Sequence, residues 1–407
     1  MVGNPVSPEL NYLAAGLSER GVLRAYVRPY AVKGRGWERW LMTHGGSLYA
    51  KTWGRRLLPD GLDPALVAET GLAWDVLAAV VRRGRPAWGG MAQACEARRG
   101  AAVDREMARL LRADDCAVVA NYGAGLRSLR RAAALGLPSV LNYPIAVHSF
   151  SQRILEEEAD LVPDFARTLS FVDLPRELRA RMDEECRMAD RILVGSSFAR
   201  ESFRETGLDL GKIRVVPYGV DTDLFRPPMG EPIVKSVFRV LFVGQLSQRK
   251  GLSYLLEGYR QFRKSDTELL LVGNACGDYR PLEPWADYFT HRPNVPRSFL
   301  PALYRGADVL VLPSLVEGMP LVVLEAMACG VPVIVTANGP SDVVQDGEAG
   351  IVVPIRDSNA IAVALERMYS DADLRQRMGT RAASVAAGFT WQTYAERACS
   401  VVEEAGL

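Results

Sequence analysis

The sequence contains few cysteines and histidines, and its cysteines lack the spacing of metal sites. Only three histidines occur in 407 residues, and none of the six cysteines belongs to a CxxC pair or has a histidine at zinc spacing. This pattern argues against a zinc site and a disulfide framework and predicts reduced thiols in the core. The cysteines are Cys95, Cys116, Cys186, Cys276, Cys329 and Cys399.

Net charge and long hydrophobic runs are lacking as well. The 49 basic and 48 acidic residues give a net charge of +1, so no nucleic-acid partner is expected. No apolar run approaches about 18 residues, and the N-terminus has no charged-then-apolar signal pattern. A cytoplasmic protein is expected, with a peripheral role at the inner face of the membrane left open. The absence of GxGxxG after a strand argues against a redox dinucleotide enzyme.

The chain does contain short apolar runs that alternate with helical stretches. This alternation predicts an α/β fold with parallel sheets, and the length predicts two domains. The expected strands are residues 23–27, 117–120, 139–142, 191–194, 213–216, 238–243, 268–272, 309–312, 331–336 and 350–353. We expect a first strand that is short or missing, because Asn4-Pro5 is typical of a turn, and then a helix over 8–20 capped by Ser7. An incorrectly assigned start codon and a divergent first loop would both explain this.

The stretch from Ala307 to Gly330 gives the strongest indication of a site. Its run 309–312 is typical of a strand buried on both faces, and Pro313 ends the strand. Pro320 suits the first position of a helix over 319–329, which ends at Gly330. The free N–H groups and the dipole at that helix N-terminus favour an anion such as a phosphate.

Two carboxylates accompany this predicted anion site. Glu317 precedes the helix, and Glu325 lies five residues after Pro320, about 7.5 Å along the axis at about 1.5 Å per residue. Carboxylates accept hydrogen bonds from paired hydroxyls, so the layout suits a sugar at one end of a long ligand and a ribose at the other. Alternatively, Glu317 is only a favourable charge at a helix N-terminus and Glu325 an ordinary solvated residue.

The pattern PSLxEGxPLxxLEAMACGxPV around these glutamates closely resembles the signature of the retaining nucleotide-sugar glycosyltransferases of family 4. The resemblance implies the fold called GT-B, in which two Rossmann-like doubly wound domains face each other across a cleft. It also implies that Glu317 holds the transferred sugar and Glu325 the donor ribose. The segment between them that is expected to bind the donor comprises Gly318, Met319, Pro320 and Leu321.

A second motif follows the predicted strand 238–243. In GQLSQRKG, residues 244–251, adjacent cations at the start of a helix can neutralise the charges of a departing diphosphate. The order of the motifs resembles the family's GRLxxxKG, which implies that Gly244 approaches the donor and Lys250 is the phosphate lysine. Gln245 stands where many members have arginine, and Arg249 is inferred to replace that charge.

Other site residues follow from the resemblance alone. Val295 and Arg297 are predicted to contact the nucleobase, and Gly3 to approach the donor phosphates. His148 follows a strand end at Tyr143-Pro144, and the family has a histidine near the donor sugar. His44 is a weaker candidate for a loop role, and His291 is predicted at the surface.

The resemblance also implies the domain limits. We expect an acceptor-binding domain over 1–217, a hinge over 218–234 that resembles PxGVDxxxF, a donor-binding domain over 235–385, and a last segment over 386–407 whose helix crosses back. Asp221-Thr222-Asp223 spells DxD, the metal-diphosphate pair of a different glycosyltransferase fold. Its place in the hinge argues against that role, so no metal or other cofactor is expected.

Residues 82–131 are locally basic, with 11 arginines against five acidic residues. Arg98, Arg105, Arg109 and Arg112 share one predicted helical face. The segment Arg82 to Arg131 suits an anionic lipid or a phosphorylated acceptor, but an ordinary solvated face is the simpler interpretation. The run Glu156-Glu157-Glu158 is assigned to a solvated face too.

The sequence therefore predicts a glycosyltransferase that moves a sugar from a UDP- or GDP-sugar to an acceptor hydroxyl with retention, without a metal or a protein nucleophile. Abundant arginine and alanine suggest a GC-rich bacterial genome, where polysaccharide, glycolipid and natural-product glycosylation are all reasonable. Two alternatives stay open. One is a sugar-nucleotide epimerase on the same fold, and the other is a non-catalytic nucleotide-sugar-binding subunit, which the short first loop and Gln245 favour somewhat.

Overall fold

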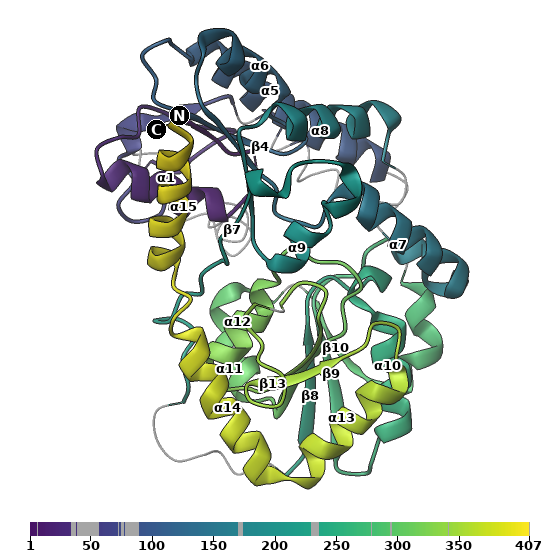
Figure 1. Cartoon of the computed structure of the whole chain (residues 1–407). Coiled ribbons are helices and arrows are strands. Elements are labelled where there is room, and N and C mark those ends of the chain that lie inside the picture. Colours follow the sequence, from purple (N-terminus) through teal and green to yellow (C-terminus); the bar gives the residue numbers. More distant parts are fainter. Residues whose placement is uncertain are drawn as a thin grey trace.

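The computed structural model contains two parallel sheets, one in each half of the chain. The N-terminal half lies above the C-terminal half in Figure 1. The residues that the structure describes are 1–5, 7–33, 38, 57–71, 73–74, 77, 89–169, 174–228, 236–277, 279–293, 295–340 and 342–406. The predicted α/β class with two parallel-sheet domains is confirmed.

The N-terminal sheet has seven parallel strands in the order β3-β2-β1-β4-β5-β6-β7. These strands are β1 (Val2–Gly3), β2 (Tyr26–Arg28), β3 (Val67–Glu69), β4 (Val118–Asn121), β5 (Ser139–Asn142), β6 (Arg191–Val194) and β7 (Ile213–Val215). The helices that accompany them are α1 (Glu9–Glu19), α5 (Gly89–Leu110), α6 (Leu126–Leu135), α7 (His148–Leu161), α8 (Arg176–Met188) and α9 (Ser197–Glu201). Short 3-10 turns cover Pro64–Leu66, Pro163–Thr168, Arg204–Thr206 and Leu210–Lys212.

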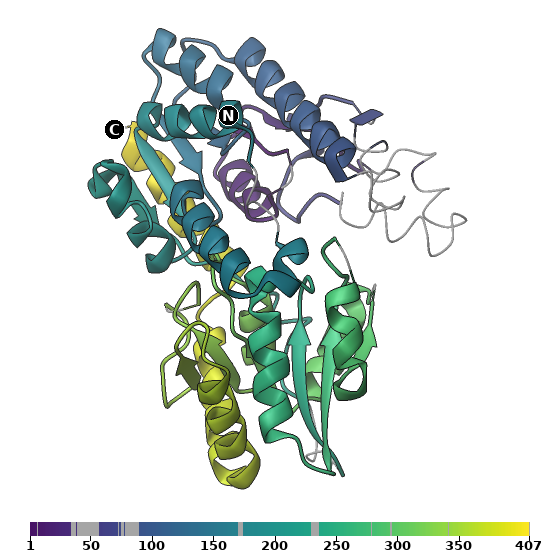
Figure 2. The same ribbon diagram turned by 90° about the vertical axis from the view of Figure 1, so that its right-hand side faces the viewer.

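The C-terminal sheet has six parallel strands in the order β10-β9-β8-β11-β12-β13. They are β8 (Phe238–Val243), β9 (Thr267–Val272), β10 (Thr290–Arg292), β11 (Val309–Leu312), β12 (Val333–Thr336) and β13 (Gly350–Val353). The helices are α10 (Leu252–Phe262), α11 (Leu300–Arg305), α12 (Leu321–Ala328), α13 (Ser358–Ser370), α14 (Ala372–Ala386) and α15 (Trp391–Gly406). The 3-10 turns are Gln248–Lys250, Arg280–Tyr288 and Arg297–Phe299. Figure 2, turned from Figure 1, shows helices packed along both sheets.

Strands β11 and β12 form the buried centre of the C-terminal domain. Every residue of both strands is buried, as expected for parallel strands covered on both faces. Helix α12 follows β11 and is buried from Val323 to Ala328, a stretch in which Glu325 is the one charged residue. It begins at Leu321 and ends before Gly330, whose φ of 78° favours glycine. This packing fixes the helix N-terminus at the carboxyl edge of the sheet.

The first strand is short, which is one of the two expected alternatives: it spans two residues, and Val2 pairs with both Tyr26 and Val119. Three other sequence-based details are corrected by the structure. Ser7 does not cap α1, because its hydroxyl donates a hydrogen bond to Asn121 Oδ1 instead. The core assignment of the cysteines is wrong for Cys116, which is exposed, and for Cys276, which is half-buried. Glu158 is buried rather than solvated.

Two backbone segments connect the halves of the chain and lie side by side. The Val220 N–H donates to Phe389 O at 2.8 Å, and Val220 forms a parallel bridge with Thr390. Gly219 allows this close approach, because a Cβ at that position would lie 2.2 Å from Trp391 N. The two crossings therefore form one paired connection.

Helix α15 returns from the second crossing to the N-terminal half, where it runs beside α1 (Figure 1). Tyr12 stacks on Trp391 with ring centroids 4.1 Å apart. At the other end of α15, Glu403 pairs with Arg20 at 2.5 Å and Glu404 with Arg214 at 3.1 Å. Among the residues described, none of the helices has the length and apolarity required to cross a membrane.

Candidate active site

Glu317 lies between β11 and α12 and pairs with two cations of the C-terminal domain. Its Oε1 lies 2.8 Å from Arg249 Nη1 and 2.5 Å from Lys250 Nζ. The Ser314 hydroxyl lies 3.3 Å from the same oxygen. The side chains of Glu317, Arg249 and Lys250 are 9%, 11% and 10% exposed. The predicted catalytic residues are Glu317, Arg249, Lys250 and His148. The structure brings the first three of them into direct contact around the Glu317 carboxylate.

The cluster of Glu317, Arg249 and Lys250 contains two positive charges and one negative charge. Burial raises the pKa of Glu317, but Arg249 and then Lys250 outweigh that effect and hold the pKa below its ordinary value. Burial lowers the pKa of Lys250, while Glu317 opposes the change. Two cations share one carboxylate beside the N-terminus of α12, so the cluster suits a guest that carries more than one negative charge.

Backbone contacts hold the cation turn, residues 247–251, against the end of β11. Leu315 N–H donates to Arg249 O at 2.9 Å, and Arg249 Nη1 donates to Val316 O at 2.8 Å. Gly251 has a φ of 70°, and a Cβ there would lie 2.0 Å from Pro313 O. The two sequence motifs therefore meet because their loops bind each other directly.

Asn338 and Gly339 support Glu317 and were assigned no site role from the sequence. A Cβ on Gly339 would lie 2.6 Å from the Cβ of Glu317, and the φ of Gly339 is 143°. The Asn338 amide donates to Leu315 O at 2.7 Å. The loop after β12 therefore closes over the carboxylate, and the Asn-Gly pair, typical of turns, was the only signal for it.

Glu325 lies farther along α12 in a second polar cluster. Its Oε2 accepts a hydrogen bond from the Tyr304 hydroxyl at 3.0 Å, and Arg297 Nη2 lies 3.5 Å from Oε1. Burial raises the pKa of Glu325 to about 6, although Arg297 and Tyr304 lower it. Val295 is half-buried, whereas Arg297 is exposed with its guanidinium 5.4 Å from the Phe225 ring centroid. Tyr304 was missed because a tyrosine within a helix has no sequence signal for this contact.

Loops of the N-terminal half cover the segment from Glu317 to Leu321. A Cβ on Gly318 would lie 1.8 Å from Pro144 O, and the Ser196 hydroxyl donates to Gly318 O. Met319 Sδ accepts a hydrogen bond from Tyr218 N–H at 3.1 Å. Met319 and Pro320 are buried, and Leu321 is half-buried. The two halves of the chain therefore meet at the N-terminus of α12.

His148 is the first residue of α7 and faces a small internal cavity. The cavity, of about 20 Å³, is also lined by Tyr122, Arg249 and Val316. His148 Nε2 lies 3.4 Å from Asp183 Oδ1. Burial lowers the pKa of His148, and Asp183 only partly opposes this, so the imidazole is neutral at neutral pH.

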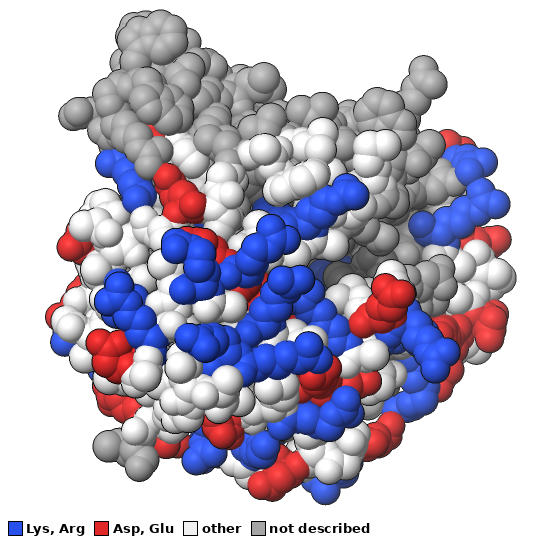
Figure 3. Space-filling model, turned by 90° about the horizontal axis from the view of Figure 1, so that it is seen from above, with Lys and Arg blue, Asp and Glu red and all other residues white. Residues whose placement is uncertain are grey.

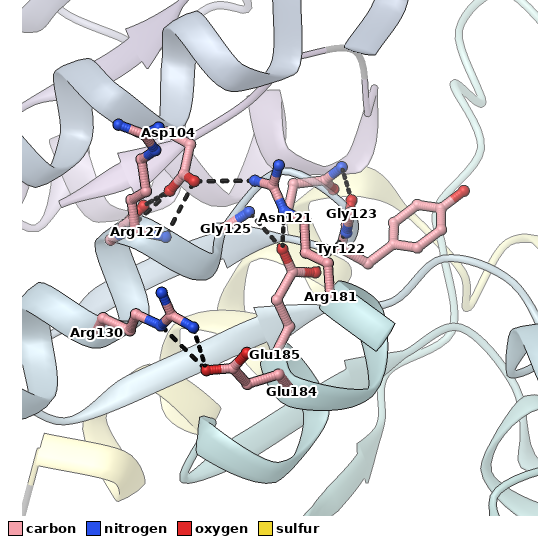
Figure 4. Close-up of polar contacts among 11 residues, drawn as sticks. Asp104, Asn121, Tyr122, Gly123, Gly125, Arg127, Arg130, Arg181, Glu184 and Glu185 are labelled. Atoms are coloured by element: carbon pink, nitrogen blue, oxygen red, sulfur yellow. Dashed lines mark hydrogen bonds and ion pairs between the residues drawn. The ribbon is translucent and has the colours of Figure 1, made fainter. Parts of the chain in front are cut away.

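A network of carboxylates holds the loop beside this cavity, residues 121–125 after β4 (Figure 4). Glu185 accepts hydrogen bonds from the N–H groups of Gly123 and Gly125, at 2.5 and 2.8 Å. Arg181 bridges Glu185 and Asp104, at 3.2 and 2.9 Å. Asp104 also accepts from the first N–H groups of α6. These contacts fix the loop that presents Tyr122 to the cavity.

The remaining residues that the sequence singled out differ in whether they lie beside the cluster of Glu317, Arg249 and Lys250. Gly244 lies beside Lys250, and Gln245 is exposed. Gly3 packs closely against Met107, since a Cβ at this position would lie 2.1 Å from Met107 Sδ. The role of Gly3 toward the donor phosphates stays a prediction. Asp221 Oδ1 closes a turn by accepting from the N–H groups of Asp223 and Leu224.

The predicted roles of the other two histidines differ in outcome. His44 lies outside the described residues. His291 belongs to β10 and is half-buried rather than on the surface, with Nε2 2.8 Å from Gly273 O.

Comparison with known proteins decides the family. Residues 237–371 match the model described as glycosyl transferases group 1, and residues 43–224 match the model described as glycosyltransferase family 4. The chain belongs to glycosyltransferase family 4. The chain is similar to the D-inositol 3-phosphate glycosyltransferases of Paenarthrobacter aurescens (34% identity over 53% of this chain and 58% of the relative) and Nocardia farcinica (33% over 51% of each). It spans about half the length of the curated relatives that it matches.

Solved structures show the same architecture as this family 4 chain. Sucrose-phosphate synthase from Thermosynechococcus elongatus superposes with a TM-score of 0.63 and 20% identity, over 99% of this chain and 95% of that one. Anabaena HepE in complex with UDP has a TM-score of 0.63 and 16% identity, over 99% and 97%. At such low identity the similarity concerns the fold, and the predicted GT-B fold is confirmed.

Proposed function

We propose that the chain transfers a sugar from a nucleoside-diphosphate sugar to an acceptor hydroxyl, with retention of anomeric configuration. The observation that carries this proposal is the cluster of Arg249, Lys250 and Glu317 at the N-terminus of α12, with Glu325 on the same helix. Family membership supports it, and so do relatives that are named as glycosyltransferases.

In the proposed reaction the diphosphate lies against Arg249, Lys250 and the first amides of α12. These groups stabilise the negative charge that develops as the sugar–oxygen bond breaks. Glu317 then accepts hydrogen bonds from the transferred sugar, and Glu325 from the donor ribose. The acceptor hydroxyl attacks on the face from which the diphosphate departs and passes its proton to the departing phosphate oxygen, so the product keeps the configuration of the donor. Two buried cations supply the positive charge, and we propose that no metal is required.

The first experiment is thermal stabilisation by UDP, GDP, ADP and TDP, each with EDTA present. A shift with one nucleotide identifies the donor base, and nucleoside diphosphate released from the matching donor sugar together with a new glycosidic product establishes transfer. Inositol phosphate is the first acceptor to test, because the relatives carry that substrate in their names. Interconversion of the donor sugar without release would support an epimerase, and binding without any reaction would support a non-catalytic subunit.

The raised pKa of Glu325 predicts how nucleotide binding depends on pH. An ionised carboxylate accepts hydrogen bonds from both ribose hydroxyls, whereas the protonated group must donate one. Since the pKa of Glu325 is about 6, the contribution of Glu325 to nucleotide affinity should be nearly complete above about pH 7 and should decrease below 6, by at most about tenfold per pH unit. Calorimetric titration from pH 5 to 8 measures this.

The control for that titration is Glu325→Gln. The terminal phosphate of the nucleotide also titrates near pH 6, so only the difference between the two pH profiles reports on Glu325. Identical profiles in the unaltered chain and in Glu325→Gln would contradict a ribose-binding carboxylate.

We also propose that the basic face of the N-terminal domain contacts an anionic membrane surface. Figure 3 shows Lys and Arg side chains gathered on the face seen from above. In this domain Arg98, Arg105, Arg112, Arg127 and Arg131 are exposed, although Arg109 and Arg130 pair with Glu106 and Glu184. Arg82 lies outside the described residues. Sedimentation with vesicles containing phosphatidylglycerol, but not with pure phosphatidylcholine vesicles, would support this contact.

A further inference from the structure

Glu158 is a carboxylate of the N-terminal domain that is buried against the C-terminal domain. It lies on α7, and its side chain is 0% exposed. Its Oε1 accepts a hydrogen bond from Gln248 Nε2 at 2.7 Å, and its Oε2 accepts one from Arg356 Nε at 2.8 Å. Burial, and after it the neighbouring Glu158 carboxylate, raises the pKa of the Tyr254 hydroxyl. A buried carboxylate requires such partners, so this contact specifies one arrangement of the two domains.

Gln248 links this contact to the cation turn. It is the residue immediately before Arg249 and Lys250, and its side chain is completely buried. Its backbone N–H donates to Thr168 Oγ1 of the N-terminal domain at 2.9 Å, and its Oε1 accepts from Ser253 N–H at 3.0 Å. Both domains therefore hold Gln248, and its position determines where the two cations lie.

Arg356 makes its contact with Glu158 from a strained backbone conformation. Its φ is 61°, and it is the one non-glycine residue with a positive φ in the described part of the chain. From this conformation its guanidinium reaches both Glu158 and, through Nη2 at 3.0 Å, the carbonyl of Ile154 on the same helix. Surrounding contacts must hold a residue in this region, and these two bonds across the domain boundary do so.

We infer that Glu158 is a positioning residue for the donor diphosphate, acting across the domain boundary through Gln248. The cation turn is then set for a diphosphate only when the N-terminal domain is closed on it. The inference rests on the proposed function, since it assigns Arg249 and Lys250 to the diphosphate. Glu158 itself contacts only protein groups, and its effect reaches the ligand through the next two residues of the turn.

The test is Glu158→Gln, with Glu156→Gln as the matched control. Glu156 lies on the same helix, is exposed and contacts Gln152 at 2.6 Å. In Glu158→Gln we expect about tenfold weaker binding of UDP or GDP, whichever the unaltered chain binds, and a donor KM about tenfold higher. Glu156→Gln should bind and react as the unaltered chain does. Unchanged affinity and KM in folded Glu158→Gln would overturn the inference.

A second variant tests whether Glu158 acts through the cation turn or only by holding the two domains together. Gln248→Met keeps the side-chain volume and the Glu158–Arg356 pair but removes the hydrogen bonds of the Gln248 side chain to Glu158 and to Ser253. It should reproduce the tenfold loss, and it serves as the test if Glu158→Gln does not fold. Loss in Glu158→Gln without loss in Gln248→Met would show that Glu158 only holds the domains together and would overturn positioning through Gln248.

Hydrogen exchange of the peptide that spans 244–252 provides a readout that needs no ligand. Faster exchange in both variants than in Glu156→Gln supports the inference even if none of the nucleotides binds, in which case only the proposed function fails. Equal exchange in all three variants would contradict the inference whatever the binding data show.

Discussion

Lys250→Ala should lower the rate of nucleoside diphosphate release by a factor of about 10² to 10³. Lys250 Nζ lies 2.5 Å from Glu317 at the N-terminus of α12, where it can stabilise the departing diphosphate. Arg249 still pairs with Glu317 in this variant, so the buried carboxylate keeps a partner and the fold should persist. Steady-state release from the donor that binds measures the rate, and circular dichroism checks the fold.

The matched control for that variant is Lys264→Ala. Lys264 belongs to the same domain but pairs at the surface with Glu366 at 2.8 Å. It should retain the rate of the unaltered chain. Near-normal turnover in Lys250→Ala would remove the basis for a glycosyltransferase mechanism at this site.

Glu317→Gln should lower the stability of the chain without nucleotide and increase the stabilisation that nucleotide provides. Without the carboxylate, Arg249 and Lys250 are two buried cations that have lost their shared counter-charge, and the free energy of unfolding should fall by about 3 kcal/mol. A bound diphosphate supplies the missing charge, so nucleotide should stabilise this variant more than it stabilises the unaltered chain. Turnover should fall by at least about 10², because the sugar loses a charged carboxylate and one of its two acceptor oxygens is replaced by a donor NH₂ group. Urea unfolding with and without nucleotide measures both stability changes.

The stabilisation that the Glu317 carboxylate provides with Arg249 and Lys250 depends on pH. Because the pKa of Glu317 lies below its ordinary value in the folded chain, its stabilisation is present above the ordinary glutamate range and is lost as the pH falls through the folded pKa. Glu317→Gln should lack this part of the acid destabilisation. Glu257→Gln is the control, since Glu257 pairs with Arg260 at the surface. Equal nucleotide stabilisation in Glu317→Gln and in this control would contradict a diphosphate site at the cluster.

The sequence predicted those parts of the fold that local signals determine. The bounds of β11 and β8 follow from apolar runs with proline or glycine at their ends, and they match the prediction. Ser7 was misassigned because Asn121, 114 residues away, takes the hydroxyl that would have capped α1. Glu158 was misassigned because a run of three glutamates is typical of solvent, whereas one side of α7 packs against the other domain. Such competition between distant residues has no local signature.

The same distinction holds for the candidate site. Glu317, Lys250 and Arg249 were found from two motifs, and the structure brings them together. Tyr304 contacts Glu325 only because α11 packs on α12, which the spacing of residues along the chain does not encode. The roles of Gly3 and His148 toward the donor stay predictions.

The paired crossings at Val220 and Thr390 constrain how the domains can move. One backbone hydrogen bond and one bridge join the two crossings, so neither crossing can shift without the other unless that contact breaks. We therefore expect the domains to hinge at this shared connection. The Glu158 contact lies away from it on α7, and we expect that contact to separate and re-form as the domains move.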